Sequence, residues 1–105
     1  MIQIQFGVQK KAIQTIKVQG HANSGPYGQD LVCCAVSAIA LSSLNAIDTL
    51  YPNTCRLEAK DNVVSIEVLH NSSELQVSLH FMQEQLRALF LEYPKFIRMH
   101  VDDLK

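Results

Sequence analysis

Apolar and polar residues alternate at the start of the chain. Glutamines separate the apolar positions, which are Ile2, Ile4 and Phe6. This period-two pattern predicts a strand with one buried face. Residues 7–11 then predict a turn, and a second strand follows with Ile16 and Val18 in phase. Ile13 is one residue out of phase with them, which indicates a β-bulge or a late start of the strand.

The alternation disappears in a glycine-rich segment over residues 20–30, where we expect a loop. Asp30 is a good N-cap residue, and the stretch 31–50 contains no glycine or proline. This stretch predicts a long helix that ends near Pro52. Apolar or small residues surround nearly the whole of its first three turns, so we expect the helix to be central and buried.

Two further strands are predicted at residues 55–59 and 64–68, where apolar and polar residues alternate on both sides of a polar turn. Asn71 and Glu74 have the spacing of a capping box, and an apolar stripe at helical spacing follows them. The chain from 72 to 93 is therefore predicted to be a second helix. Alternating apolar residues early in this stretch also fit a strand, but the length of the stripe favours the helix.

Pro94 ends the second helix, and the alternation over residues 97–101 predicts a short last strand. The resulting order is β-β-α-β-β-α-β, and both helices are able to cover the same face of a sheet. The sequence therefore predicts an α/β (α+β) fold, a two-layer sandwich of one sheet with two helices packed on one face.

Length and composition fit one small domain over residues 1–105, with 48% hydrophobic and 18% charged residues. The net charge of −1 gives no reason to expect nucleic-acid binding. Residues 31–47 look too short and too polar to span a membrane, and residues 1–8 lack a signal-peptide pattern, so we expect a cytosolic protein. The three cysteines have neither the CxxC spacing nor the histidine neighbours of a metal site.

Candidate chemistry is concentrated in the segment 20–37, whose sequence is GHANSGPYGQDLVCCAVS. With Asp30 as N-cap, Cys33 lies in the first turn of the predicted helix, where unpaired amides and the helix dipole favour a thiolate. The amides of Cys33 and Cys34 are expected to stabilise an oxyanion. His21 lies twelve residues before Cys33, and a glycine-containing loop of this length can bring the imidazole to the sulfur. A thiol beside an imidazole is an arrangement used for nucleophilic catalysis.

The candidate residues of the segment 20–37 also fit purely structural roles, such as helix capping and core packing. Cys33 fits a packing position in an apolar helix, and Asp30 fits a helix cap better than a third catalytic group. Ser37, one turn after Cys33, fits either a hydrogen bond to substrate or sulfur, or simple helix packing. The other thiols are expected to be small buried side chains, namely Cys34 and Cys55. The other histidines are expected at the surface, namely His70, His80 and His100.

The segment 20–37 resembles the signature of the ribosomal-processing cysteine protease family, Prp. The matching positions are Gly20, His21, Ala22, Gly28, Asp30, Leu31, Val32, Cys33 and Ser37, followed in the same helix by Ser43, Asn45 and Ala46. Beyond Leu50 the resemblance is carried by length and element order. Two residues depart from the pattern: Cys34 stands at a position that is usually small and alanine-like, and Pro26 lies in a loop that the family keeps mobile.

This resemblance implies a cysteine endopeptidase, a hydrolase of the bacterial cytoplasm that removes a short N-terminal extension from a large-subunit ribosomal protein. Cys33 would be the nucleophile and His21 the general base, with Asp30 and Ser37 as supporting residues. The resemblance also implies a homodimer, no metal or organic cofactor, and no direct contact with nucleic acid or membrane.

Two alternatives stay open on the residues alone. The chain also fits a non-catalytic dimeric binding module that acts in ribosome assembly, with Cys33 as an inert packing thiol. A redox-sensing pair of Cys33 and Cys34 is the other alternative, although their side chains lie about 100° apart around a helix. A reactive thiolate at Cys33 below about pH 8 would favour the protease.

Overall fold

The computed structural model describes residues 1–20 and 29–104, and the described part contains five strands and two helices. In chain order they are β1 (Ile2–Gln9), β2 (Ala12–Gln19), α1 (Gln29–Leu50), β3 (Cys55–Lys60), β4 (Val63–Val68), α2 (Ser73–Glu92) and β5 (Ile97–Asp103). The predicted order β-β-α-β-β-α-β is confirmed.

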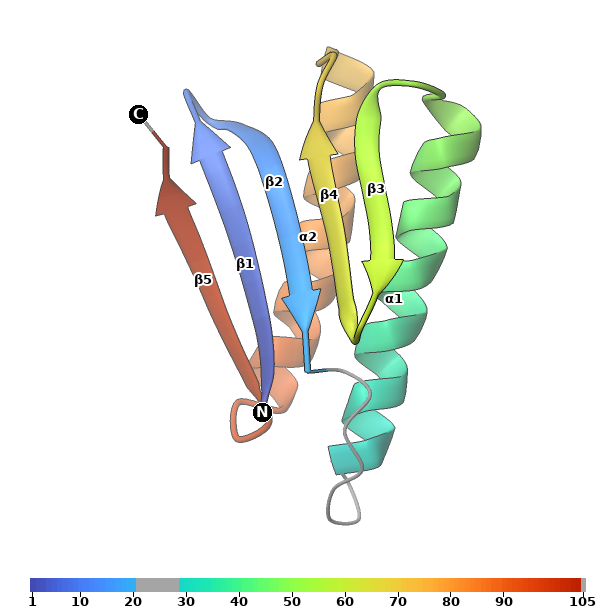
Figure 1. The fold of residues 1–105 in the computed structure, drawn as a ribbon. Helices are drawn as coiled ribbons and strands as arrows, with labels where there is room; N and C mark the ends of the chain where they lie inside the picture. The colour runs from blue at the N-terminus through green and yellow to red at the C-terminus, as the bar shows by residue number, and fades with distance from the viewer. Residues whose placement is uncertain (21–28, 105) are drawn as a thin grey trace.

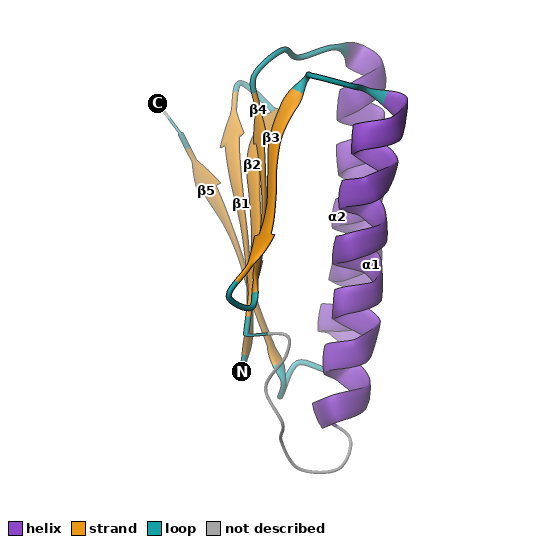
Figure 2. Cartoon of the chain, turned by 45° about the vertical axis from the view of Figure 1, so that its right-hand side comes forward, coloured by secondary structure: helices purple, strands orange, loops and turns teal. Residues whose placement is uncertain are grey.

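The five strands form one mixed sheet in the order β3-β4-β2-β1-β5. Neighbouring strands are antiparallel except β1 and β5, which run parallel. Both helices lie on the same face of the sheet, α1 over the β3–β4 side (Figures 1 and 2). The predicted two-layer sandwich, with its helices on one face, is therefore confirmed.

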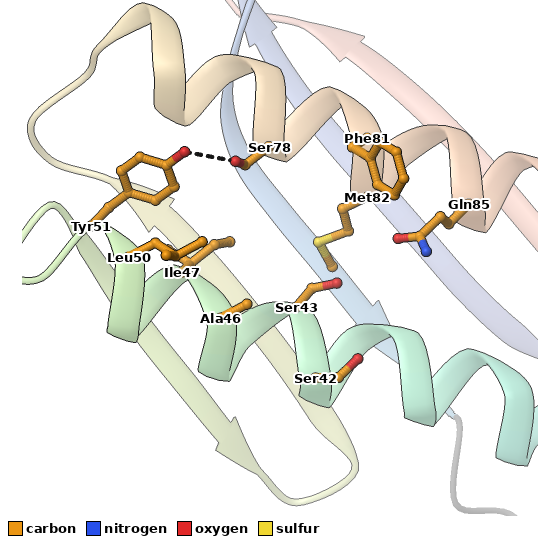
Figure 3. Close-up of a pocket in the computed structure, with 10 residues that line it drawn as sticks. All are labelled: Ser42, Ser43, Ala46, Ile47, Leu50, Tyr51, Ser78, Phe81, Met82 and Gln85. Carbon is orange, nitrogen blue, oxygen red and sulfur yellow. Dashed lines mark hydrogen bonds between the residues drawn. The ribbon is translucent and has the colours of Figure 1, made fainter.

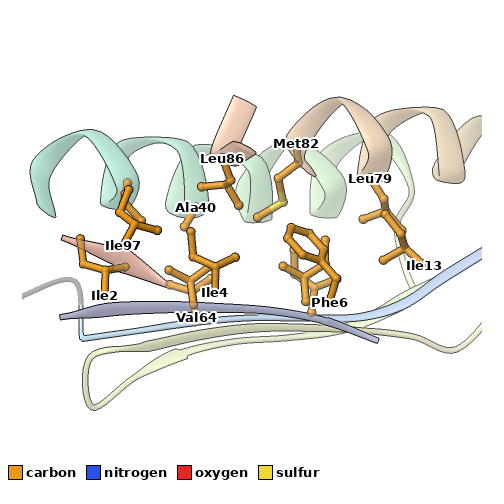
Figure 4. Packing of buried hydrophobic residues seen from close by; sticks show 14 of the residues in the cluster. Ile2, Ile4, Phe6, Ile13, Ala40, Val64, Leu79, Met82, Leu86 and Ile97 are labelled. Carbon is orange, nitrogen blue, oxygen red and sulfur yellow. The ribbon is translucent and has the colours of Figure 1, made fainter. Parts of the chain in front are cut away.

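The core fills the space between the sheet and the helices. Its members include Ile2, Ile4, Phe6, Ile13, Ala40, Val64, Leu79, Met82, Leu86 and Ile97 (Figure 4). They come from the inward positions of the strands and from the apolar stripes of both helices, as the period-two and helical patterns require. The opposite face of the sheet carries the alternate polar residues, such as Gln3, which is exposed.

The β1–β2 hairpin contains a bulge. Gly7 pairs with Thr15, but Val8 pairs with Ile13, so the register shifts by one residue on β2. The extra residue, Gln14, lets both Ile13 and Ile16 face the core, where they are 0% and 1% exposed. The bulge suggested by the out-of-phase Ile13 is confirmed.

The side chain of Gln76 on α2 holds the backbone of β2 at this bulge. Its Oε1 accepts a hydrogen bond from the amide of Ile13 at 2.8 Å. Its Nε2 donates to the carbonyl of Ile13, also at 2.8 Å, and to Oδ1 of Asn71 at 2.9 Å. One amide side chain therefore satisfies both backbone groups of a fully buried residue. The sequence contains no local signal for this contact.

Replacing Gln76 by leucine should destabilise the fold by about 2–4 kcal/mol, because an unsatisfied buried donor and acceptor each cost about 1–3 kcal/mol. Thermal or urea unfolding followed by circular dichroism measures this loss. Gln83→Leu makes the same exchange two turns further along α2 and is the matched control. Equal stability of the two variants would contradict the role of Gln76.

Helix α1 differs from the prediction of a central, buried helix. Its sheet-facing residues Val36 and Ala40 are fully buried, but Leu31 and Leu50 are 63% and 66% exposed. Only one side of α1 meets the sheet, so the apolar character of the other side is not explained by the core. By length and composition alone, Leu31–Leu50 is apolar enough to cross a membrane, contrary to the sequence-based expectation. In the fold, one side of this helix packs against the sheet and the other side is exposed.

Helix α1 begins two residues before its predicted start, and α2 begins one residue after its predicted start. Since α1 begins at Gln29, Asp30 lies in its first turn and is not the N-cap. The N-cap of α2 is Ser72, whose Oγ accepts from the amide of Leu75 at 3.1 Å, and not Asn71. The side chain of Asn71 instead accepts from Gln76. A polar run offers several residues suited to capping, and only the path of the chain selects one of them.

Candidate active site

Cys33 lies near the start of α1 on its sheet-facing side, where it is 4% exposed and belongs to the core cluster. Cys34 is exposed, because successive helix residues point about 100° apart. The expectation that Cys34 is a small buried side chain is therefore wrong. The separation of the two thiols onto different sides of the helix agrees with the prediction.

The position at which α1 begins changes which backbone amides are available to stabilise an oxyanion. In a helix that begins at Gln29, the amide of Cys33 lies beyond the first four, and helical geometry pairs it with the carbonyl four residues earlier. The same holds for Cys34. Their amides are therefore not the free donors expected for an oxyanion, and the donors at this end belong to the residues before Cys33.

The predicted supporting residues lie on either side of Cys33 in the same helix. Ser37 follows one turn later and is half-buried. Asp30 precedes Cys33 within the first turn of α1. The structure thus places these three residues along the first two turns of α1.

His21 lies outside the described residues. The residue before it, Gly20, is described, and its backbone conformation and contacts are defined. Gly20 follows the end of β2 with a φ of 82°, and a Cβ atom here would come within 2.8 Å of the carbonyl oxygen of Met1. Its amide donates to the carbonyl of Asn62 at 3.3 Å. Only glycine fits this position, because both the positive φ and the close backbone exclude a side chain. The chain therefore leaves the sheet toward His21 beside the β3–β4 turn.

Cys55 is an unsuitable nucleophile. It is half-buried on β3, and burial raises the pKa of its thiol above the ordinary value. A hydrogen bond donated by Oγ1 of Thr54 to the sulfur, at 3.6 Å, partly offsets this rise in the pKa. A thiol with a raised pKa forms less of the reactive thiolate near neutral pH.

The remaining histidines, His70, His80 and His100, are exposed, as predicted. Nδ1 of His80 lies 2.8 Å from the carbonyl oxygen of Gln76 in the preceding turn of α2. Within the ranges 1–20 and 29–104, His, Cys, Asp and Glu form no group of three able to hold a metal ion.

A hollow of about 350 Å³ lies between α1 and α2. It is lined by Ser42, Ser43, Ala46, Ile47, Leu50, Tyr51, Ser78, Phe81, Met82 and Gln85 (Figure 3). The hydroxyl of Tyr51 closes one end, 2.8 Å from Oγ of Ser78 and donating to the carbonyl of Glu74 at 3.1 Å. This lining has no thiol, imidazole or carboxylate, so the hollow offers no group for nucleophilic or acid–base chemistry.

A family model described as cysteine protease Prp matches residues 1–98 of the chain. The chain belongs to the Prp family of cysteine proteases. The ribosomal processing cysteine protease Prp of Staphylococcus aureus is 31% identical over 93 residues, which cover 84% of this chain and 86% of the relative. The Prp of Mycoplasma pneumoniae is 32% identical over 84 residues, covering 78% and 81% of the two chains.

Solved structures of similar proteins have the same fold. The S. aureus Prp in complex with a substrate peptide superposes with a TM-score of 0.89 at 28% identity, covering 97% of this chain and 100% of the other. The same protease with a covalently linked product peptide gives a TM-score of 0.85 at 29% identity, with the same coverage. SMU.848 from Streptococcus mutans gives 0.86 at 25% identity, covering 99% and 96%.

Membership of the Prp family confirms the resemblance seen in the segment 20–37 and the assignment as a cysteine protease. It decides against the non-catalytic binding module as the description of this chain. The individual roles of His21, Cys33, Asp30 and Ser37 stay predictions.

Proposed function

We propose that this Prp-family protease removes a short N-terminal extension from a large-subunit ribosomal protein in the bacterial cytoplasm, with Cys33 as nucleophile and His21 as general base. The observation that carries the proposal is the covalently linked product peptide held by the S. aureus relative, whose fold matches 97% of this chain. A covalent link to product is the mark of nucleophilic catalysis. The resemblance of the segment 20–37 to the family signature supports Cys33 as the nucleophile of this chain.

The proposed reaction has two stages. His21 takes the proton of the Cys33 thiol, and the sulfur attacks the carbonyl carbon of the scissile bond. The carbon–nitrogen bond then breaks, His21 returns the proton to the leaving amine, and a thioester remains on Cys33. Water then attacks the thioester while His21 takes one of its protons. The carbon–sulfur bond breaks, His21 returns this proton to the sulfur of Cys33, and the peptide leaves as a carboxylic acid that ionises in solution. Thiol and imidazole thus carry every proton transfer, and these steps use no metal or organic cofactor.

Ser37 and Asp30 are the supporting residues of this proposal. Ser37 lies one turn after Cys33, within reach of a substrate group bound over the first turns of α1. Asp30 lies in the first turn, where a carboxylate is favoured by the positive end of the helix dipole. We assign both residues a positioning role at the start of α1, and neither of them takes part in the bond-making and bond-breaking steps.

Cleavage of a synthetic peptide tests the proposed function. The peptide spans the junction between the N-terminal extension and the mature ribosomal protein, and mass spectrometry identifies the fragments. We expect a single cut at the junction. A peptide that stays intact with the wild-type chain, while the S. aureus Prp cuts its own substrate peptide, would contradict the assignment of this substrate.

We also propose that the protease is a homodimer, and that the outer side of the helix layer forms the contact. Residues 31–47 contain no charged residue, although the outward positions of α1, such as Ala38, are exposed. Phe81 on α2 is 67% exposed beside them. An uncharged face with small and apolar side chains is typical of a helix covered by another copy.

Light scattering after gel filtration should give about twice the chain mass of 11.8 kDa. Ala38→Glu should shift the protein to the monomer mass, because a buried carboxylate without a partner opposes association. Gln3→Glu adds the same charge to the opposite face of the molecule and should leave the dimer intact. A wild-type monomer at micromolar concentration would contradict the proposed dimer.

A further inference from the structure

The hollow between α1 and α2 has an apolar floor. Ile47 of α1 and Met82 of α2 line it and are 4% and 2% exposed, whereas Leu50 at the rim is exposed. In Figure 3 the thioether of Met82 points from α2 toward α1, into the space between the helices. The hydroxyls of Tyr51 and Ser78 lie 2.8 Å apart and hydrogen-bond to each other, so their polarity is satisfied within the chain. The hollow therefore favours an apolar occupant.

The size of this hollow suits one aromatic ring. Its volume is about 350 Å³. An apolar cavity of about 150 Å³ is large enough to hold benzene, so a phenyl ring fits here with room at the mouth. The sulfur of Met82 would lie against such a ring, and a sulfur–aromatic contact adds to the gain from burying the ring.

Phe81 presents such a ring on the same face of the molecule. It lines the hollow but is 67% exposed, so most of the side chain stands outside it. In a contact with two-fold symmetry, residue i of one copy meets residue j of the other, and residue j meets residue i. An exposed ring at the rim of a hollow of matching size is therefore self-complementary, because each copy can fill the hollow of the other.

The charge of this face also suits a second copy of the chain. None of the ten lining residues is charged, and residues 31–47 of α1 contain no charged residue. In a two-fold contact, side chains close to the axis meet their own copies, so a charged group there would face a like charge. An uncharged patch avoids this repulsion.

A second hollow, of about 230 Å³, lies between α1 and the β3–β4 hairpin and lacks these features. It is lined by Leu41, Ala59, Lys60, Asp61, Asn62, Val63 and Val64. Two of these residues are charged and none is aromatic. This second hollow therefore provides an internal comparison for the first.

We propose that the Phe81 ring of each copy inserts into the α1–α2 hollow of the other copy. The inference rests on the homodimer proposed above, and it identifies the side chain and the hollow that hold the two copies together. Each dimer contains two such insertions, so one substitution in the chain removes both.

Sedimentation equilibrium over a series of protein concentrations measures the dimer Kd. Phe81→Ala should raise this Kd at least about a hundred-fold, because each dimer loses two buried aromatic side chains. Val101→Ala removes an exposed apolar side chain from β5, at the far edge of the sheet, and should keep the wild-type Kd. Because Phe81 is exposed in the single chain, Phe81→Ala should also keep the wild-type circular dichroism spectrum.

Ala46→Leu distinguishes insertion from general apolar attraction. Ala46 lines the α1–α2 hollow and is exposed, so a leucine here occupies the hollow and excludes the ring of the partner. The Kd should rise at least about ten-fold, although the variant has more apolar surface. A contact driven by apolar area alone would become tighter. Ala59→Leu makes the same exchange in the second hollow and should keep the wild-type Kd.

A wild-type Kd in Phe81→Ala, or a tighter dimer in Ala46→Leu, would overturn the insertion and leave the hollow to a different occupant. Equal weakening in Ala46→Leu and Ala59→Leu would overturn it as well. In each of these cases the wild-type dimer itself stands. A wild-type chain that stays monomeric across the series would instead contradict the proposed homodimer, so the two failures are distinguishable.

Discussion

Cys33→Ala is expected to lower kcat/KM for the junction peptide by at least about a thousand-fold, because the variant lacks the sulfur that forms the proposed thioester. Binding should persist, since the peptide contacts remain. Fluorescence polarisation of a labelled peptide measures the binding, and single-turnover cleavage measures the chemistry. A loss in kcat with little change in peptide affinity would locate the role of Cys33 in the chemical step.

The neighbouring thiol supplies the matched control for this prediction. Cys34→Ala removes an exposed side chain on another side of the helix and should retain cleavage close to the wild-type rate. Because Cys33 is 4% exposed, its replacement also removes a packing contact, and unfolding measurements should show a loss of about 1–2 kcal/mol. Near-wild-type cleavage by Cys33→Ala, or loss of cleavage in Cys34→Ala alone, would show that the nucleophile is misassigned.

His21→Ala is expected to lower kcat/KM about a hundred- to ten-thousand-fold, the usual contribution of a general base. The wild-type profile should rise with pH as the imidazole loses its proton, since only the neutral ring accepts the thiol proton. The variant should lose this rise while keeping the peptide affinity, and a pH series of single-turnover rates measures both profiles.

A surface histidine serves as the control for His21. His100 is exposed on β5 at the far edge of the sheet, and His100→Ala should leave the rate and its pH profile unchanged. If His21→Ala cleaves with the wild-type pH profile, another group acts as the base and the proposed pair is wrong.

The fold was largely predictable because its elements carry local signals. Alternating residues marked all five strands, and even the bulge at Ile13 was visible as a break in the alternation. The stripe from Leu75 to Leu86 marked the second helix. Capping was less predictable: Asn71 and Ser72 are both good caps, and the choice depends on where the chain turns after β4.

Part of the candidate site was also predictable from the sequence, and part of it was not. The segment 20–37 resembles the family signature, so the sequence predicted Cys33 and His21 as the catalytic pair, and these roles stay predictions. The exposure of Cys34 was predicted wrongly, because an apolar helix sequence does not show which side meets the sheet. The hollow beside Ala59 was not foreseen either, since it needs Leu41 and the β3–β4 hairpin to face each other.

The sequence by itself determined the order of the elements, the bulge and the family signature, because each depends on residues close together in the chain. Only the tertiary structure decided that Gln76 holds Ile13, which lies 63 positions earlier, and that α1 covers the sheet with one side only. It also decided that a hollow lies between Leu41 on α1 and Ala59 on β3. Such features depend on how distant segments pack, and local periodicity carries no information about that packing.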